Sequence, residues 1–318
     1  MAVYFSINKN DLLLLLKEYD VGTLEKFEGI LEGIENTNYL INTSKNTFIL
    51  TIFGKRVNKK DLPFFINLKR HLIEKNFPCP QPITNKKGKS ISSLKGKSYV
   101  IISFLNGSKT DKITNDHCYQ VGKMLSSLHN KSLDFEQKRS NGMNYSKWEQ
   151  IFCKCQKSKN HKYLELIEPI KKELNYLKKN WPVSLPNGII HGDVFHDNVF
   201  FKNNQFSGLI DFYFACNDFF SYDIALTINA WCFENKNEFD QKKFQSLIGG
   251  YEVHRSLIQE EKNIMSILLR GAAVRILLTR LHDQLFHPID AFVKPKDPLE
   301  YFSILKFHQK INIKNYLS

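Results

Sequence analysis

Three polar residues in the second half of the chain have the types and the spacing that a reaction on a phosphate group needs. They are Asp193, Asn198 five positions later and Asp211 thirteen positions after that. A carboxylate can accept the proton of an attacking hydroxyl, and an amide oxygen with a second carboxylate suits Mg²⁺, whose shell water and phosphate oxygens complete. We therefore predict that Asp193 is the catalytic base and that Asn198 and Asp211 bind the metal ion.

The residues around these three extend the pattern. His191-Gly192-Asp193 comes before Asn198, and Leu209-Ile210-Asp211-Phe212 ends a predicted strand. The spacing H-G-D-x-x-x-x-N followed by D-F is that of the catalytic loop and metal-binding segment of kinases, with Gly in place of the Arg of H-R-D. Asp and Asn alone are ordinary turn formers, but five matches at two fixed spacings make coincidence improbable. We expect His191 to brace the loop by hydrogen bonding.

The first hundred residues have the alternating, β-branched patterns of an antiparallel sheet. They also predict a short helix from Asn10 or Asp11 to Tyr19 and a longer one from Asp61 to Lys75, with Pro63 in its first turn. The predicted strands are Gly22–Ile30, Asn38–Thr43, Asn46–Phe53, Ser90–Leu94 and Ser98–Leu105.

Helical periodicity dominates the rest of the chain. A helix from about Thr114 is followed by helical patterns near 145–157, 161–180, 219–233, 240–254, 260–285 and 298–310, with strands only around Ile189–Phe201 and Phe206–Ile210. We therefore predict an α+β bilobal fold. A small antiparallel β-sheet lobe with a helix, residues 1–105, would bind nucleotide, and a larger, mostly helical lobe, residues 106–318, would carry catalysis and substrate binding.

The H-G-D segment resembles that of the aminoglycoside phosphotransferase and choline kinase superfamily, whose fold is protein-kinase-like. Further segments are similar to one branch, the bacterial homoserine kinases of the phosphotransferase type. These segments are Glu32–Tyr39, Asp61–Phe65, Phe77–Pro82, Ser207–Cys216, Asn229–Phe233, Arg270–Ala273 and Leu277–Leu281. The resemblance implies ATP and Mg²⁺ as cofactors, and phosphorylation of L-homoserine to O-phospho-L-homoserine, a step toward threonine.

The resemblance also implies where the nucleotide binds. The phosphate loop would lie at Glu32–Asn38, which holds a single glycine, and its candidate contacts are Gly33, Ile34 and Asn36. Many kinases of this fold have a phosphate-binding Lys on the third strand, but Thr51 occupies that place here, and Lys55 and Arg56 follow as alternatives. Backbone groups around Ser103 and Leu105 are expected to bind adenine.

Homoserine is a zwitterion with a hydroxyl, so its site needs a cation for the carboxylate. Arg270, Arg275 and Arg280 are candidates, because a guanidinium binds a carboxylate through two parallel bonds. One or two of them are expected to form structural ion pairs instead. The remaining candidates follow Asp211 in the sequence, with core packing as the alternative for the aromatic pair and a helix-dipole role for Asp223. They are Tyr213, Asp218, Asp223, Asn229 and Trp231.

The composition adds few constraints. The net charge of +13 comes from 45 Lys and Arg against 32 Asp and Glu, but only seven of the 45 are Arg and the Lys are scattered, so we predict no nucleic-acid partner. Six Cys in a chain of this length predict reduced thiols and a cytoplasmic protein. The apolar run Leu12–Leu16 is too short to span a membrane.

Two other functions stay open at this point. Within the same fold, the acceptor could be choline, methylthioribose or an aminoglycoside, although neither an aromatic cage nor a cluster of acidic residues stands out. From a different class, the chain could be a non-catalytic basic binding protein. The intact Asp193, Asn198 and Asp211 are evidence against that second alternative.

Overall fold

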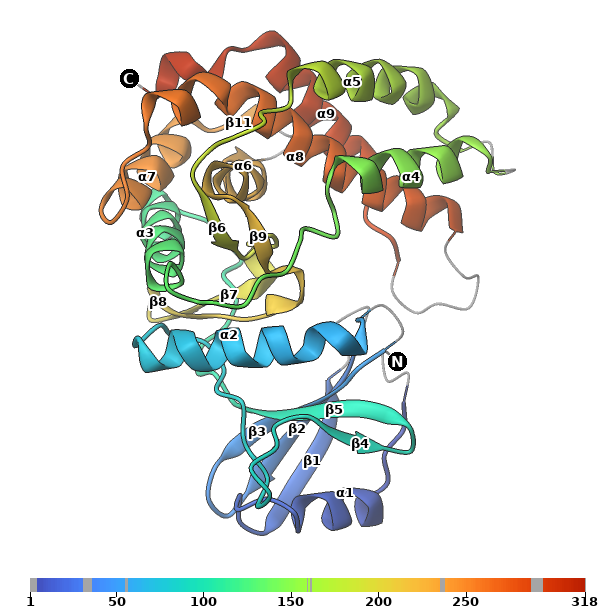
Figure 1. Ribbon diagram of the computed structural model, residues 1–318, viewed down its shortest axis with the longest axis vertical. Helices are drawn as coiled ribbons and strands as arrows, with labels where there is room; N and C mark the ends of the chain where they lie inside the picture. Colours follow the sequence, from blue (N-terminus) through green and yellow to red (C-terminus); the bar gives the residue numbers. More distant parts are fainter. Residues whose placement is uncertain are drawn as a thin grey trace. The chain divides into compact units, whose positions relative to one another are not determined.

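The structure is a computed structural model that describes residues 5–30, 36–54, 57–158, 160, 162–234, 238–286 and 294–317. The chain divides into two compact units, shown in Figure 1. The first unit contains Met1–Gly107 and Ser207–Tyr213, and the second contains Ser108–Phe206 and Phe214–Ser318. Asp211 therefore belongs to the first unit, together with the predicted nucleotide-binding residues, whereas Asp193 and Asn198 belong to the second.

The first unit is built on a five-stranded antiparallel sheet with the strand order β1-β2-β3-β5-β4. Alternate residues of β2, among them Tyr39 and Ile41, are buried and share a hydrophobic core with Leu50 and Ile52 of β3 and Leu12 of α1. The elements are α1 (Lys9–Leu16), β1 (Leu24–Ile30), β2 (Thr37–Thr43), β3 (Thr47–Ile52), α2 (Leu62–Glu74), β4 (Ser92–Leu94) and β5 (Lys97–Ser103).

These bounds agree with the predicted strands and with the longer helix to within a few residues. The short helix differs, because its N-cap is Asn8 and neither Asn10 nor Asp11. The Oδ1 atom of Asn8 accepts a hydrogen bond from the backbone N of Asp11 at 2.8 Å. The helix consequently begins at Lys9 and ends at Leu16 rather than at Tyr19.

The second unit is mostly helical and is organised around the 28-residue helix α8, which contacts α4, α5, α6 and α9. Its helices are α3 (Asn115–Lys131), α4 (Tyr145–Gln156), α5 (Ile167–Asn180), α6 (Phe220–Trp231), α7 (Gln241–Glu252), α8 (Gln259–Phe286) and α9 (Pro298–Lys310). Figure 1 shows α6 surrounded by the other helices of this unit, and each residue of α6 is buried.

Short strands frame the segment that carries Asp193. Strand β6 (Asn187–Ile190) precedes it and pairs with β9 (Cys216–Phe219), while β7 (Val199–Lys202) follows it and pairs with β8 (Gln205–Leu209). Strand β9 is not among the predicted strands, and neither are β10 (Phe233–Glu234) and β11 (Glu238–Phe239). These strands have only two to four residues, which is too short for an alternating pattern to show.

The predicted α+β class is confirmed, with a small antiparallel sheet in the N-terminal region and a mostly helical C-terminal part. Within the described residues, none of the helices has the length and apolar character needed to cross a membrane. The six cysteines are all free thiols, as predicted.

Candidate active site

One buried carboxylate accepts hydrogen bonds from the backbone of the loop at His191–Asn198. Asp223, in the first turn of α6, is completely buried, and its two oxygens accept hydrogen bonds from the backbone N of His191 and the backbone N of Gly192, both at 2.8 Å. The His191 side chain is also fully buried, consistent with a bracing role. The structure therefore favours a positioning role for Asp223 over the predicted substrate contact.

Glycine is required at the second position of the H-G-D motif. Gly192 has a φ of +74°, and a Cβ atom there would lie 3.3 Å from the carbonyl oxygen of Phe214 and 3.8 Å from Nη1 of Arg275. A side chain at this position would be strained and crowded. The loop consequently turns with its backbone close to Arg275, immediately before Asp193.

Asn198 orients the predicted base. Its amide nitrogen donates to the backbone carbonyl of Asp193 at 2.8 Å and to the Asp193 carboxylate at 3.0 Å. Because the nitrogen is used within the loop, the amide oxygen is the atom that suits a cation, as the predicted metal-binding role requires. Asp193 is partly exposed, whereas Asn198 is buried, so the carboxylate can reach a ligand while its neighbour holds it.

Trp231 supports the same loop from the end of α6. Its indole Nε1 donates to the carbonyl of Val194 at 2.8 Å, and its ring meets the ring of His196 edge-on at 4.6 Å between centroids. Since Trp231 is fully buried, its position favours loop support and core packing over the predicted substrate contact.

A buried histidine sets the charge of the Asp223 carboxylate. Nε2 of His129 lies 3.1 Å from Asp223, and its Nδ1 lies 2.8 Å from the hydroxyl of Tyr251. Burial lowers the pKa of His129 despite Asp223, so the imidazole is neutral and donates through Nε2. Burial acts to raise the pKa of Asp223, but the hydrogen bonds from His129 and His191 outweigh it, and the pKa falls below its usual value. The loop is thus anchored on a carboxylate that stays ionised.

The predicted metal ligand Asp211 follows β8 within the first unit. Its φ of +62° places it in the left-handed region, which Asp and Asn tolerate better than most residues. Tyr213, two positions later, meets the rings of Phe53 at 5.3 Å and Phe65 at 5.5 Å between centroids, both edge-on. Burial raises the pKa of Tyr213, and the structure places its ring in this aromatic cluster of the first unit.

The predicted nucleotide contacts are only partly described. Gly33, Ile34 and the alternative cations Lys55 and Arg56 lie outside the described residues. Oδ1 of Asn36 accepts from the backbone N of Gly54 at 3.2 Å. The hydroxyl of Thr51, a buried residue in β3, donates to Oδ1 of Asn38 at 2.8 Å.

The two residues predicted to bind adenine have different contacts in the structure. The backbone N of Ser103 donates to the carbonyl of Gln81 at 2.8 Å, so it is already engaged in the fold. The side chain of Leu105 lies against Gly208, where an added Cβ would approach Cδ2 of Leu105 to 2.5 Å. An adenine contact through the backbone of Leu105 stays a prediction.

The three arginines of α8 have different partners. Arg270 makes a two-pronged ion pair with Glu173, at 2.6 Å and 2.7 Å, and stacks on Tyr176. Arg280 is paired with Glu300 at 2.6 Å. Arg275 is only 3% exposed, and no described carboxylate lies within ion-pair distance of it. Arg270 and Arg280 thus form ion pairs, the alternative that we expected for one or two of these arginines, and Arg275 is the remaining candidate for the substrate carboxylate.

Two further predicted substrate residues also have defined partners. Asn229 is 2% exposed, and it donates to the carbonyl of Leu269 at 2.9 Å and accepts from Nε2 of His308 at 2.7 Å. Both ends of its amide are thus used in the core, which argues against the predicted substrate contact. Asp218 is partly buried and accepts from Asn141 at 2.6 Å, and burial raises the pKa of its carboxyl.

Comparisons with known proteins agree with this geometry. The profile of the phosphotransferase enzyme family matches residues 26–257. A homoserine kinase of Brucella melitensis biotype 2 is 43% identical over 311 residues, covering 98% of this chain and 95% of its own. A homoserine kinase of Agrobacterium fabrum is 44% identical over 317 residues, covering 99% and 98%. The chain belongs to the phosphotransferase enzyme family.

Solved structures of other phosphotransferases and kinases share the fold. A spectinomycin phosphotransferase in complex with ADP and spectinomycin superposes with a TM-score of 0.70 at 17% identity, covering 98% of both chains. The amicoumacin kinase in complex with AMP-PNP, Ca²⁺ and Ami gives a TM-score of 0.71 at 15% identity, covering 98% of this chain and 95% of its own. The predicted protein-kinase-like fold is confirmed, and the protein is a phosphotransferase that acts on a hydroxyl group.

Three residues of this phosphotransferase that sequence reasoning did not single out contribute to the two segments. His129 and Tyr251 extend the hydrogen-bond network of Asp223, which holds the loop at His191–Asn198. No pattern in their local sequence indicates this role. Lys69 of α2 is buried beside Tyr213. A signal for Lys69 was present, because it lies four positions after Phe65 and three before Leu72, on the apolar face of its helix.

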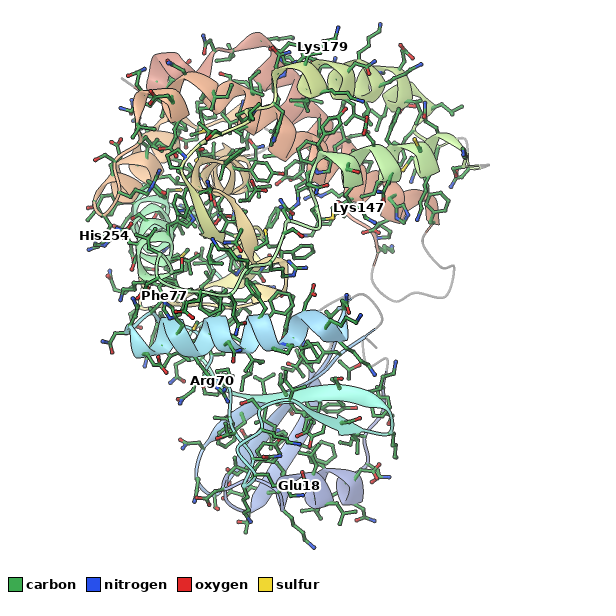
Figure 2. The ribbon with its side chains drawn as sticks, in the orientation of Figure 1. Glu18, Arg70, Phe77, Lys147, Lys179 and His254 are labelled. Carbon is green, nitrogen blue, oxygen red and sulfur yellow. The ribbon has the colours of Figure 1, made fainter. Side chains whose placement is uncertain are left out.

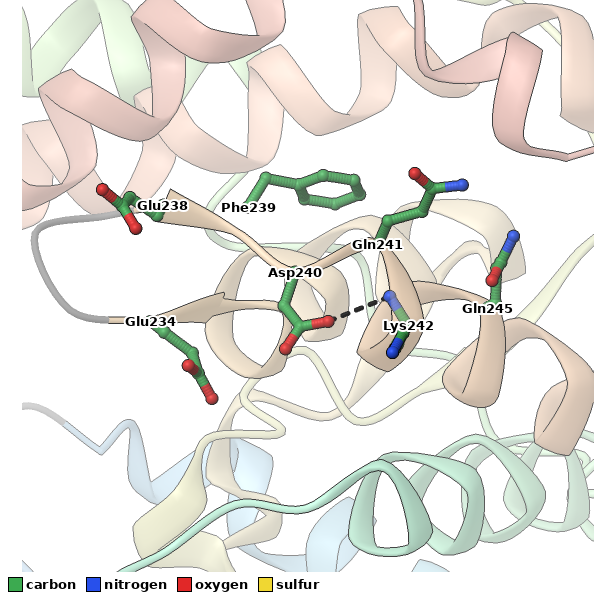
Figure 3. Close-up of a pocket in the computed structure, with 7 residues that line it drawn as sticks. All are labelled: Glu234, Glu238, Phe239, Asp240, Gln241, Lys242 and Gln245. Atoms are coloured by element: carbon green, nitrogen blue, oxygen red, sulfur yellow. Dashed lines mark hydrogen bonds between the residues drawn. The ribbon is translucent and has the colours of Figure 1, made fainter.

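A pocket of about 530 Å³ in the second unit is formed by other residues, shown in Figure 3. Asp240, at its centre in the view, caps α7 by accepting from the backbone N of Lys242 at 2.9 Å. The pocket is lined by Glu234, Glu238, Phe239, Asp240, Gln241, Lys242 and Gln245, none of which is a predicted site residue. Its carboxylates do not suit an anionic nucleotide, so we do not assign the reaction to it.

Proposed function

We propose that this protein transfers the γ-phosphoryl group of ATP to the hydroxyl of L-homoserine, giving O-phospho-L-homoserine. Full-length similarity to homoserine kinases, at 43% and 44% identity, carries the proposal. The reaction would serve threonine formation, and a cytoplasmic location stays a prediction from the free thiols.

In this proposal Asp193 accepts the proton of the homoserine hydroxyl. The hydrogen bonds from Asn198 hold the Asp193 carboxylate in one orientation, and Asp223 holds the backbone on which Asp193 is mounted. A positioned base lowers the barrier because the carboxylate need not be reoriented in the transition state. His191 and Trp231 contribute as supports of that backbone.

The donor set of the segments fits Mg²⁺. The amide oxygen of Asn198 and the carboxylate of Asp211 are hard oxygen ligands, of the kinds that Mg²⁺ takes in kinases. Bound Mg²⁺ would neutralise negative charge on the phosphates of ATP. Asp193 would then need to supply only proton acceptance and orientation.

We assign the homoserine carboxylate to Arg275. A buried guanidinium without a carboxylate partner is unfavourable, and a bidentate bond to a ligand carboxylate would compensate it. Arg275 also lies next to Gly192, so a molecule bound to it is adjacent to the catalytic loop. Asp218, whose charge interacts with that of Arg275, would attract the α-ammonium group.

The test is a coupled ADP-release assay with homoserine, choline, methylthioribose and an aminoglycoside as separate acceptors. We expect turnover with homoserine at a kcat/KM at least about 100-fold above that with choline, because choline has no carboxylate for Arg275. Preferred turnover of another acceptor would refute homoserine as the substrate. Absence of turnover with all four, together with salt-sensitive binding to nucleic acid, would favour a non-catalytic basic protein.

A further inference from the structure

Lys69 is a buried lysine on the helix that packs next to the predicted metal-binding segment. It lies in α2, and only 3% of the residue is exposed. Lysine is rarely buried to this degree, because removing its ammonium group from water costs several kcal/mol unless other charges or ligands compensate. The burial of Lys69 therefore indicates that other charges or a ligand compensate its ammonium group.

Its surroundings connect it to the position where the usual strand lysine is missing. Nζ of Lys69 lies 5.7 Å from the centroid of the Tyr213 ring. The hydroxyl of Tyr213 also interacts with the side chain of Thr51, the residue of β3 at the predicted phosphate-binding place. Lys69, Tyr213 and Thr51 thus form a continuous group within the first unit.

The charges around Lys69 favour an ammonium ion. Burial lowers its pKa to about 8, and the negative charge of Asp211 limits that decrease. Near neutral pH the group is therefore mostly protonated. Asp211 is the proposed ligand of a metal ion that bridges phosphates, so a cation that interacts with Asp211 lies close to those phosphates too.

We propose that Lys69 supplies, from α2, the positive charge for the nucleotide phosphates that strand β3 lacks. β3 has the sequence Thr47-Phe-Ile-Leu-Thr-Ile52 and contains no cation. The inference rests on the proposed function, because it assumes that ATP is the phosphoryl donor. It goes further by assigning the phosphate-binding cation to a helix residue.

The experiment compares binding of AMP-PNP and of adenosine by the full chain, with isothermal titration calorimetry in the absence of any acceptor. The test variant is Lys69→Met, which keeps an unbranched side chain without the charge. The matched control is Arg70→Met, which removes the neighbouring cation of α2, labelled in Figure 2, whose guanidinium donates to Ser90 at 2.6 Å. A double variant, Lys55→Gln with Arg56→Gln, tests the alternative cations.

We expect Lys69→Met to weaken AMP-PNP binding by about 10- to 100-fold, the range for a lost hydrogen bond to a charged group, and to leave adenosine binding within about twofold. Arg70→Met should change neither. Equal AMP-PNP affinity for Lys69→Met and wild type would overturn the inference, as would a loss confined to the Lys55 and Arg56 variant. If wild type itself bound no AMP-PNP, the proposed function would fail instead.

Two further variants keep the test possible if Lys69→Met does not fold. Lys69→Arg retains the charge, and Lys69→Gln removes it but keeps a polar end that can hydrogen-bond in the same space. Retained AMP-PNP affinity in Lys69→Arg with loss in Lys69→Gln supports the inference. Equal affinity in the two variants would overturn it, because binding would then not depend on the charge.

Discussion

The contacts described for the two segments that carry the predicted chemistry differ in kind. The backbone of the loop at His191–Asn198 is fixed by buried side chains. Asp223 accepts hydrogen bonds from two of its amides, and Trp231 donates to the carbonyl of Val194. The contacts described for Tyr213, beside Asp211, are edge-on aromatic contacts and a buried ammonium group.

This difference has a functional meaning. A general base must be oriented to within a fraction of an ångström, and directional hydrogen bonds provide such orientation. A group that attracts phosphates acts through charge, which depends less on direction. We therefore expect conservative substitutions in the loop to disturb geometry and rate, and substitutions around Tyr213 to disturb nucleotide affinity.

The largest effect is expected from Asp193→Asn. Asparagine has the same shape and can still accept from the amide of Asn198, so the loop should persist while the base is lost. We predict that kcat falls by about 100- to 10,000-fold and that AMP-PNP affinity changes little. Rapid-quench and calorimetric measurements test the two parts. The control is Asp197→Asn, an exposed carboxylate of the same loop, and substantial turnover in Asp193→Asn would remove Asp193 from the base role.

Asp223→Asn should test whether the buried network is what fixes the loop. An amide has one acceptor oxygen where the carboxylate has two, so it cannot accept from His191, Gly192 and His129 together without bringing its NH₂ against a donor. We predict a loss of about 3 kcal/mol in unfolding free energy and a reduced kcat in the protein that stays folded. Urea unfolding measures the first, and an unchanged midpoint would contradict the network.

Much of the fold could be predicted because it depends on local pattern. The strand Thr47–Ile52 and the helix Asn115–Lys131 follow from β-branched runs and from apolar spacing, and Thr114 caps the helix as its sequence suggests. Asp193 and Asn198 could be proposed as site residues because the expected chemistry fixes their spacing along one loop.

The roles of the surrounding residues could not be predicted, because they depend on partners distant in the sequence. Arg270 pairs with Glu173, which lies 97 positions away in the sequence. The local sequence predicts that Asp223 interacts with the dipole of its own helix. In the structure its carboxylate accepts hydrogen bonds from the backbone of His191 and Gly192 and so fixes the loop. No local pattern contains that information.

The arginines of α8 allow the substrate assignment to be tested on one helix. Arg275→Lys should raise the KM for homoserine by about 10- to 100-fold, because an ammonium group cannot reproduce a bidentate bond to the carboxylate, while the KM for ATP stays unchanged. Arg270→Lys is the matched control, and it should lower the melting temperature without changing the KM for homoserine, since Glu173 is its partner. If Arg270→Lys instead raised the KM for homoserine and Arg275→Lys only lowered the melting temperature, Arg270 would be the ligand of the substrate carboxylate.

The smallest effect concerns acid stability, which should be lost first in the unit that holds the loop. Burial lowers the pKa of His308, in α9 of the second unit, to about 3, and Arg270 adds to the decrease. Below about pH 6.5 the His308 side chain binds a proton in the unfolded chain but not in the folded chain. The free energy of unfolding therefore decreases as the pH falls from about 6.5 to about 3. The buried, neutral His129 contributes in the same direction.

We predict that His308 alone contributes a slope of up to about 1.4 kcal/mol per pH unit in the unfolding free energy. His308→Gln can keep the hydrogen bond to Asn229 but cannot titrate, so the slope between pH 6 and pH 4 should decrease by that amount. The chain has three tryptophans, Trp148, Trp181 and Trp231, and all of them belong to the second unit. Urea unfolding followed by tryptophan fluorescence therefore reports on the unit that contains the histidines, and an equal slope in wild type and His308→Gln would show that the acid sensitivity arises elsewhere.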